Sequence, residues 1–195
     1  MEAVKNAPVN LYIESNPNPN TLKFVANFML IPEGLNFDYP TVDSASNSPL
    51  AQELFTFPFV QGVFVMSNFI TVSKDEETNW EEVKAGIKAH IKNYLESGKQ
   101  VIDLSKEAEV QKSAAPVSSD IDENIKGILD EYIRPAVEQD GGAIHFASFE
   151  DGVVKVVLQG ACSGCPSSTL TLKAGIENLL KRMVPEVVSV EAING

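Results

Sequence analysis

The chain has 195 residues, of which 44% are hydrophobic, and its formal net charge at pH 7 is -12. This composition is typical of a soluble globular protein with one large domain or two small ones. The acidic balance disfavours binding to nucleic acid or to anionic lipid, since both require clustered Lys and Arg. No stretch approaches the roughly 18 consecutive apolar residues of a membrane span. We therefore expect no nucleic-acid partner and no membrane partner.

The first ten residues, MEAVKNAPVN, resemble neither a secretory signal nor an Arg-rich transit segment. This predicts a cytoplasmic protein of bacterial type. A mitochondrial matrix protein is the alternative, because a transit peptide that has been removed leaves no trace.

The first half of the chain is predicted to combine short strands with two helices. Alternating apolar residues predict strands, and Ser48-Pro49 and the spacing of Val83, Ile87 and Ile91 predict helices. The Asn-Pro-Asn-Pro-Asn run at 16–20 predicts a rigid turn, which we favour over a partner surface. The expected strands are 11–15, 22–28, 63–66 and 69–73, the expected helices are 49–55 and 79–96, and 32–48 is expected to be irregular.

Residues 104–119, LSKEAEVQKSAAPVSS, are polar and small and lack a sustained apolar face. This predicts a flexible linker. It would divide the chain into a first domain at 1–103 and a second domain at 120–195, each of ordinary domain size.

The second half predicts a small α-β-β-α-β unit with a mixed three-stranded sheet. Asp120 is expected to cap the first helix with Glu123 as its capping-box partner, and Pro135 to kink or end that helix. An Asp-Gly turn at 151–152 predicts a hairpin. The expected strands are 143–149, 153–158 and 187–193, and a helix is expected over 167–183. Both halves are therefore predicted to be α+β.

The chain has only two cysteines, Cys162 and Cys165, in the segment GACSGCP. Thiolates are both the metal ligands and the nucleophiles of cysteine chemistry, and a two-residue spacer lets two sulfurs reach one metal centre. Pro166 suits the first position of the following helix, whose N-terminal N–H groups and dipole favour thiolates. The pair is therefore predicted to bind metal or to carry out redox chemistry.

A zinc site or an iron–sulfur cluster normally takes four protein ligands, which exceeds the two thiolates of one chain. His90 belongs to the first half, and nothing in the sequence places His145 beside the cysteines. Two chains around a two-fold axis would supply four thiolates. From spacing alone, three alternatives stay open: a shared [4Fe–4S] or [2Fe–2S] cluster, a thioredoxin-like dithiol, and a zinc ion bridging a dimer.

The segment GACSGCPSSTLTLKAGIE closely resembles the C-terminal domain of the NifU-like (Nfu) family, and IRPAVEQDGG before it and VPEVVSVE after it also match. NPNPNTLKF in the first half resembles the signature of the N-terminal domain of two-domain Nfu proteins. The resemblance covers most of the chain.

This resemblance implies a non-enzymatic scaffold or carrier. A [4Fe–4S] cluster, with [2Fe–2S] as the alternative, would bridge a homodimer through Cys162 and Cys165 of each subunit. The cluster would come from an upstream assembly scaffold and pass to apo-proteins such as aconitase-type dehydratases and lipoate-forming radical enzymes. Ala143 departs from the family, which often has an acidic residue there. The first domain has no cysteine and is expected to hold no cluster.

Asp140, Gly141 and Gly142 precede the first strand of the second half. We interpret them as a helix stop and turn rather than as residues that shape the cluster site. Five phenylalanines of the first half are interpreted as a core cluster: Phe55, Phe57, Phe59, Phe64 and Phe69.

Overall fold

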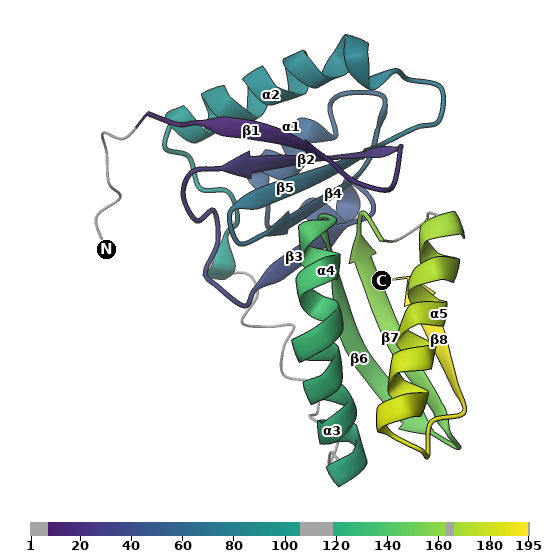
Figure 1. Ribbon diagram of the computed structural model, residues 1–195. Coiled ribbons are helices and arrows are strands. Elements are labelled where there is room, and N and C mark those ends of the chain that lie inside the picture. The colour runs from purple at the N-terminus through teal and green to yellow at the C-terminus, as the bar shows by residue number, and fades with distance from the viewer. Residues whose placement is uncertain (1–7, 106–118, 163–165, 195) are drawn as a thin grey trace. The chain divides into compact units, whose positions relative to one another are not determined.

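The computed structural model describes residues 8–105, 119–162 and 166–194. The chain forms two compact units, residues 1–112 and 113–195, each with its own sheet and hydrophobic core (Figure 1). Both units are α+β, which confirms the predicted fold class. Most of the predicted linker lies outside the described residues. At its two ends, Leu104 packs against the core of the first unit and Ser119 caps the first helix of the second.

The first unit is built on a five-stranded antiparallel sheet with the strand order β1-β2-β5-β4-β3. The predicted hairpin turn at Ser67 and Asn68 is confirmed, and Ser67 has a φ of 48°. Strand β5 lies at the centre of the sheet, between β2 and β4. The strands are β1 (Leu11–Ser15), β2 (Thr21–Ala26), β3 (Asn36–Tyr39), β4 (Val60–Met66) and β5 (Phe69–Lys74).

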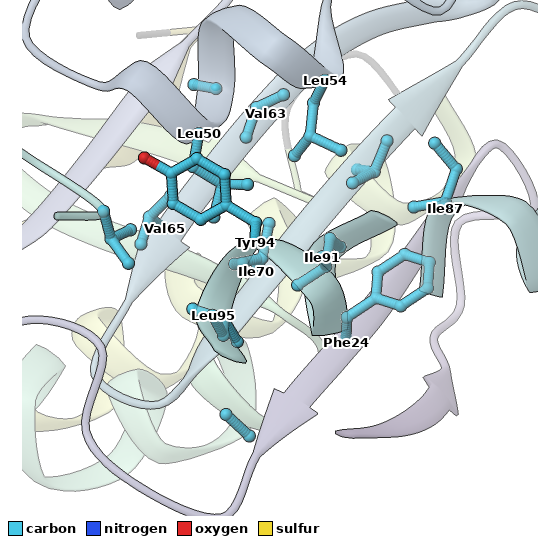
Figure 2. Packing of buried hydrophobic residues seen from close by; sticks show 14 of the residues in the cluster. Phe24, Leu50, Leu54, Val63, Val65, Ile70, Ile87, Ile91, Tyr94 and Leu95 are labelled. Atoms are coloured by element: carbon cyan, nitrogen blue, oxygen red, sulfur yellow. The ribbon is translucent and has the colours of Figure 1, made fainter. Parts of the chain in front are cut away.

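Helices α1 (Pro49–Leu54) and α2 (Trp80–Glu96) also contribute to this core. Figure 2 shows Ile87, Ile91 and Tyr94 of α2 among side chains of the sheet and of α1. The cap of α1 also joins distant parts of the chain. Fully buried Ser48 accepts a hydrogen bond from the Ala51 N–H at 3.2 Å and donates one to the Val101 carbonyl at 2.8 Å.

The predicted phenylalanine cluster divides between the two faces of the sheet. Phe55, Phe57 and Phe59 pack against the core of the first unit. Phe64 and Phe69 alternate with core residues of β4 and β5, so they lie on the opposite face, where their ring centroids are 6.1 Å apart. The prediction of one cluster was therefore wrong for these two residues.

Strand β3 lies inside the segment that was predicted to be irregular. Its residues pair with β4 in the register Phe37↔Val65 and Tyr39↔Val63. The rings of Phe37 and Tyr39 are stacked, with their centroids 6.4 Å apart. Only two apolar residues alternate in this four-residue strand, so the local pattern is weak. Hydrogen bonds and side-chain contacts with β4 therefore stabilise β3 as a strand, although its own sequence predicts a strand only weakly.

The second unit contains helical segments α3 (Asp120–Ile128), α4 (Arg134–Gln139) and α5 (Pro166–Met183) and strands β6 (Gly142–Glu150), β7 (Val153–Gly160) and β8 (Ser189–Asn194). Strand β7 pairs antiparallel with β6 and parallel with β8, which confirms the mixed three-stranded sheet. The helices lie over one face of this sheet (Figure 1) and share its core.

Two details of the first helix of this unit differ from the prediction. Ser119, rather than Asp120, is the N-cap, and it forms a reciprocal capping box with Asp122. Of the two effects expected of Pro135, a kink or an end, the end is excluded, because the helix continues past it. A π-helical turn at Leu129–Ile133 precedes it, and the Arg134 N–H bonds to the Leu129 carbonyl five residues back. The wider turn accommodates a residue without an N–H, so the helix continues as α4.

None of the helices in the described ranges is both long and apolar enough to cross a membrane.

Candidate metal–thiolate site

Cys162 lies just beyond the end of β7, in the second unit. Alternation along β7 directs Val154, Val156 and Leu158 into the core, and the chain then turns at Gly160. Cys162 is only 6% exposed and belongs to the same core cluster as Leu158. The sulfur is therefore held by the packed part of the unit rather than carried on an extended loop.

Glycines shape the backbone around Cys162. Gly160 has a φ of 67° and Gly141 a φ of 84°, a conformation that residues with a Cβ rarely adopt. The Ala161 N–H donates to the Gly141 carbonyl at 3.2 Å, which ties the segment after β7 to the end of α4. The C-terminal end of α4 and the segment after β7 thus lie close together (Figure 1).

Helix α5 begins at Pro166, four residues after Cys162, in agreement with the predicted first helical position. The side chains of residues 166–169 and all of Cys165 lie outside the described residues. The second predicted ligand is thus not placed, and its role remains a prediction.

Neither histidine is placed as a ligand beside Cys162. His145 follows Ile144 in β6, so strand alternation puts it on the sheet face opposite to the core that contains Cys162. Burial lowers the pKa of His145 below its ordinary value, and the nearby Arg134 guanidinium lowers it further. His90 lies in the first unit, with its Nε2 3.2 Å from a Glu53 carboxylate oxygen.

A metal site made by one chain would need several ligands close together. Within residues 8–105, 119–162 and 166–194, no three His, Cys, Asp or Glu side chains gather in a way that could hold a metal ion. This finding does not include Cys165, so it bears on the histidines and carboxylates rather than on the cysteine pair.

The structure places Gly142 beside Cys162, a relation that the sequence interpretation had set aside in favour of a helix stop and turn. The predicted helix stop is present: α4 ends at Gln139, and the Gly141 N–H bonds to the Glu138 carbonyl. Gly142 begins β6 and pairs with Gly160, so it lies next to the backbone that leads to Cys162. The sequence did contain a signal, because a helix stop needs one glycine and the chain has two in succession.

Comparison with known families matches both halves of the chain. Residues 11–98 match the family model described as "Scaffold protein Nfu/NifU N terminal", and residues 125–191 match the NifU-like domain.

Curated relatives are similar over nearly the whole chain. A Drosophila persimilis protein named "NFU1 iron-sulfur cluster scaffold homolog, mitochondrial" is 40% identical over 183 residues, covering 92% of this chain and 64% of the relative. The Drosophila willistoni protein of that name is also 40% identical, covering 92% of this chain and 62% of the relative. The chain thus spans less than two thirds of the length of these two relatives.

Among solved structures, a NifU-like protein from Saccharomyces cerevisiae is 27% identical with a TM-score of 0.45, covering 52% of this chain and 89% of that one. A crystal structure of a Staphylococcus aureus protein is 25% identical with a TM-score of 0.38, covering 44% of this chain and 99% of that one.

These findings correct one expectation and confirm another. The predicted bacterial cytoplasmic location was wrong, because the relatives are named as mitochondrial proteins. The absence of a transit signal had been given too much weight. The resemblance noted in the sequence is confirmed by two family models in separate units and by relatives that cover 92% of the chain. The chain belongs to the NifU-like (Nfu) family.

Proposed function

We propose that this protein is an iron–sulfur cluster scaffold and carrier, which binds a [4Fe–4S] cluster through Cys162 and Cys165 of two copies and delivers it to apo-proteins. The observation that carries the proposal is the position of Cys162, buried at the end of β7 and just before α5, in the unit that matches the NifU-like domain. The names of the relatives support a scaffold role.

The number of thiolates supports a shared site. The chain has two cysteines, whereas a [4Fe–4S] or [2Fe–2S] cluster is usually held by four. The described histidines and carboxylates form no group that would complete the set within one chain. A second copy would supply two more thiolates about a two-fold axis.

The residues around Cys162 support its role as a thiolate ligand. Helix N-termini carry a partial positive charge that lowers the pKa of a nearby thiol, and α5 starts four residues after Cys162. Burial of Cys162 in the core holds its Cβ in place and keeps water away from one side of the sulfur. The chain would thus present a sulfur whose position is fixed before the cluster binds.

The cluster is the cargo of this protein, and the proposal includes no catalytic step. A cluster held between two chains is released when the chains separate, which suits transfer. Its recipients are apo iron–sulfur proteins and its source is an upstream assembly scaffold. We place this activity in the mitochondrion, the compartment in the relatives' names.

Anaerobic reconstitution of the full chain with iron and sulfide tests the proposal. The expected result is a broad sulfur-to-iron charge-transfer absorption, about two iron and two sulfide per chain, and a native mass of a dimer with one cluster. About one iron and one sulfide per chain would instead indicate a [2Fe–2S] cluster.

Cysteine variants test the ligands. Cys162→Ala and Cys165→Ala should each remove cluster binding. Asn178→Ala, an exposed substitution on α5, should leave it intact. If both cysteine variants load as much cluster as the unsubstituted chain, the ligand assignment is wrong. If the chain retains zinc in place of a cluster, or reduces disulfides efficiently as a dithiol, the carrier proposal is overturned.

A further inference from the structure

Gly142 lies where a side chain would collide with the Gln159 carbonyl and crowd Cys162. A Cβ added to Gly142 would be 2.5 Å from the Gln159 carbonyl oxygen, 3.0 Å from Cys162 Sγ and 3.3 Å from the Cys162 backbone nitrogen. Cβ atoms essentially never lie closer than 3.0 Å to such atoms. Two of the three atoms belong to the backbone, so they move only if the segment from Gln159 to Cys162 moves.

The requirement for glycine at this position is steric rather than conformational. Gly141 and Gly160 have positive φ angles, but Gly142 does not, so its backbone conformation is open to any residue. The helix stop is completed by Gly141, whose N–H bonds to Glu138 and whose carbonyl accepts the Ala161 N–H. Gly142 is thus not needed to end the helix, and the close approach to Gln159 and Cys162 is the remaining reason for a second glycine.

We infer that Gly142 is a positioning residue for the cluster ligand, because the space left by its missing side chain is where the Cys162 sulfur lies. This inference rests on the proposed function of Cys162. A side chain at 142 would push the Gln159–Cys162 backbone away from β6 and displace the sulfur. Iron–sulfur bonds tolerate only a few tenths of an ångström, so a displaced sulfur would hold its share of the cluster less tightly.

Gly142→Ala in the full chain tests the inference, with Gly127→Ala and Gly175→Ala as matched controls. The controls are exposed helix positions where an added Cβ meets nothing within 4 Å. The half-life of the bound cluster against an iron chelator should fall by about 10- to 100-fold in Gly142→Ala, as is typical when a group that orients a metal ligand is lost. The controls should match the unsubstituted chain. A Gly142→Ala half-life equal to that of the controls overturns the inference.

A second measurement separates contact with the sulfur from general damage to the fold. Apo-protein unfolding is compared for Gly142→Ala in the natural chain and in a Cys162→Ala background, where Sγ is absent. The drop in melting temperature caused by Gly142→Ala should be smaller in the Cys162→Ala background. Folding only in that background also supports the inference. An equal drop, or failure to fold in both backgrounds, means that the backbone of Gln159 and Cys162, rather than the sulfur, requires the glycine, and overturns the inference.

The two proposals fail in different ways. If the unsubstituted chain binds no cluster, the proposed function is wrong, but the apo-protein comparison still reports on the Gly142–Cys162 contact. If the unsubstituted chain binds a cluster and Gly142→Ala retains it equally well, the function stands and the positioning role falls.

Discussion

The Asn16–Asn20 turn of the first unit and the glycine-flanked approach to Cys162 in the second are the two segments with the most unusual composition. In the turn, polar groups bond within the unit: Asn18 Oδ1 accepts the Asn20 N–H at 3.0 Å, and the Pro19 carbonyl accepts the Trp80 indole N–H at 3.1 Å. In the second segment, Gly141 and Gly160 adopt positive φ angles, and the absence of a side chain at Gly142 makes room for backbone and sulfur. The unusual residues of the turn therefore form hydrogen bonds that hold the first unit together. The glycine at 142 in the second unit instead leaves space beside the Cys162 sulfur.

This contrast separates what each segment should affect. Changes in the turn should alter the stability of the first unit and leave cluster binding intact. Changes at the end of β7 should do the reverse. The single tryptophan, Trp80, lies in the first unit, so its fluorescence reports unfolding of that unit in the full chain.

The largest expected effect is that of Cys162→Ala. Loss of one thiolate from each chain leaves two of four ligands, so reconstituted iron and sulfide should fall to background. The Trp80 unfolding curve should not shift, since the substitution is in the other unit. A shifted Trp80 unfolding curve together with retained cluster would show that Cys162 affects the stability of the first unit and not cluster binding, the opposite of what we expect.

Ser48→Ala should produce the largest loss of stability in the first unit. The substitution removes the N-cap of α1 and leaves the buried Val101 carbonyl without its partner, which costs about 2 kcal/mol of unfolding free energy. Urea unfolding followed by Trp80 fluorescence measures this value. Ser44→Ala removes only exposed hydrogen bonds to the Thr41 backbone, whose groups water can reach, and should change the unfolding free energy by about 1 kcal/mol at most. Equal effects of the two variants would show that burial of Ser48 contributes nothing.

Asn18→Ala tests whether the turn is structural. It removes the side-chain acceptor for the Asn20 N–H and should lower the unfolding free energy of the first unit by about 1 kcal/mol. The emission of Trp80 should also change, because its indole N–H bonds to the neighbouring Pro19 carbonyl. Cluster content should equal that of the unsubstituted chain. Lost cluster transfer with unchanged stability would instead make the turn a partner surface.

The smallest expected effect concerns Glu177, which joins α5 to β8 in the second unit. A hydrogen bond from Lys181 and one from the Val190 N–H, at 3.1 Å, hold the pKa of Glu177 below its ordinary value of 4.5. Its stabilising contribution is therefore present above pH 4.5 and is lost as the pH falls through the lower pKa of the folded state.

NMR titration of the apo-protein measures this effect through the Val190 amide. The chemical shift of that amide should follow the protonation of Glu177 with a midpoint below pH 4.5. In Glu177→Gln the titration should disappear. A Val190 amide that does not respond in this range would show that the carboxylate does not hold β8 in solution.

Much of the fold follows from local patterns. Strand β1, the hairpin at Ser67 and Asn68, and the α-β-β-α-β order were predictable, because alternation, helical spacing and turn residues agree there. The cap at Ser119 differs from the prediction by one residue, since Ser119 and Asp120 are both good capping residues. The π-helical turn before Pro135 was not predictable, because proline more often ends a helix than widens it.

The cysteine spacing and the motif around it were enough to identify the family and the candidate ligands, since two thiols three positions apart restrict the chemistry whatever the surroundings. Strand β3 and the closeness of Gly142 to Cys162 required the packed molecule. Both relations join residues that are about twenty or more positions apart, Tyr39 with Val63 and Gly142 with Cys162. Sheet pairing brings such residues together, and nothing in the neighbouring sequence encodes the distance between them.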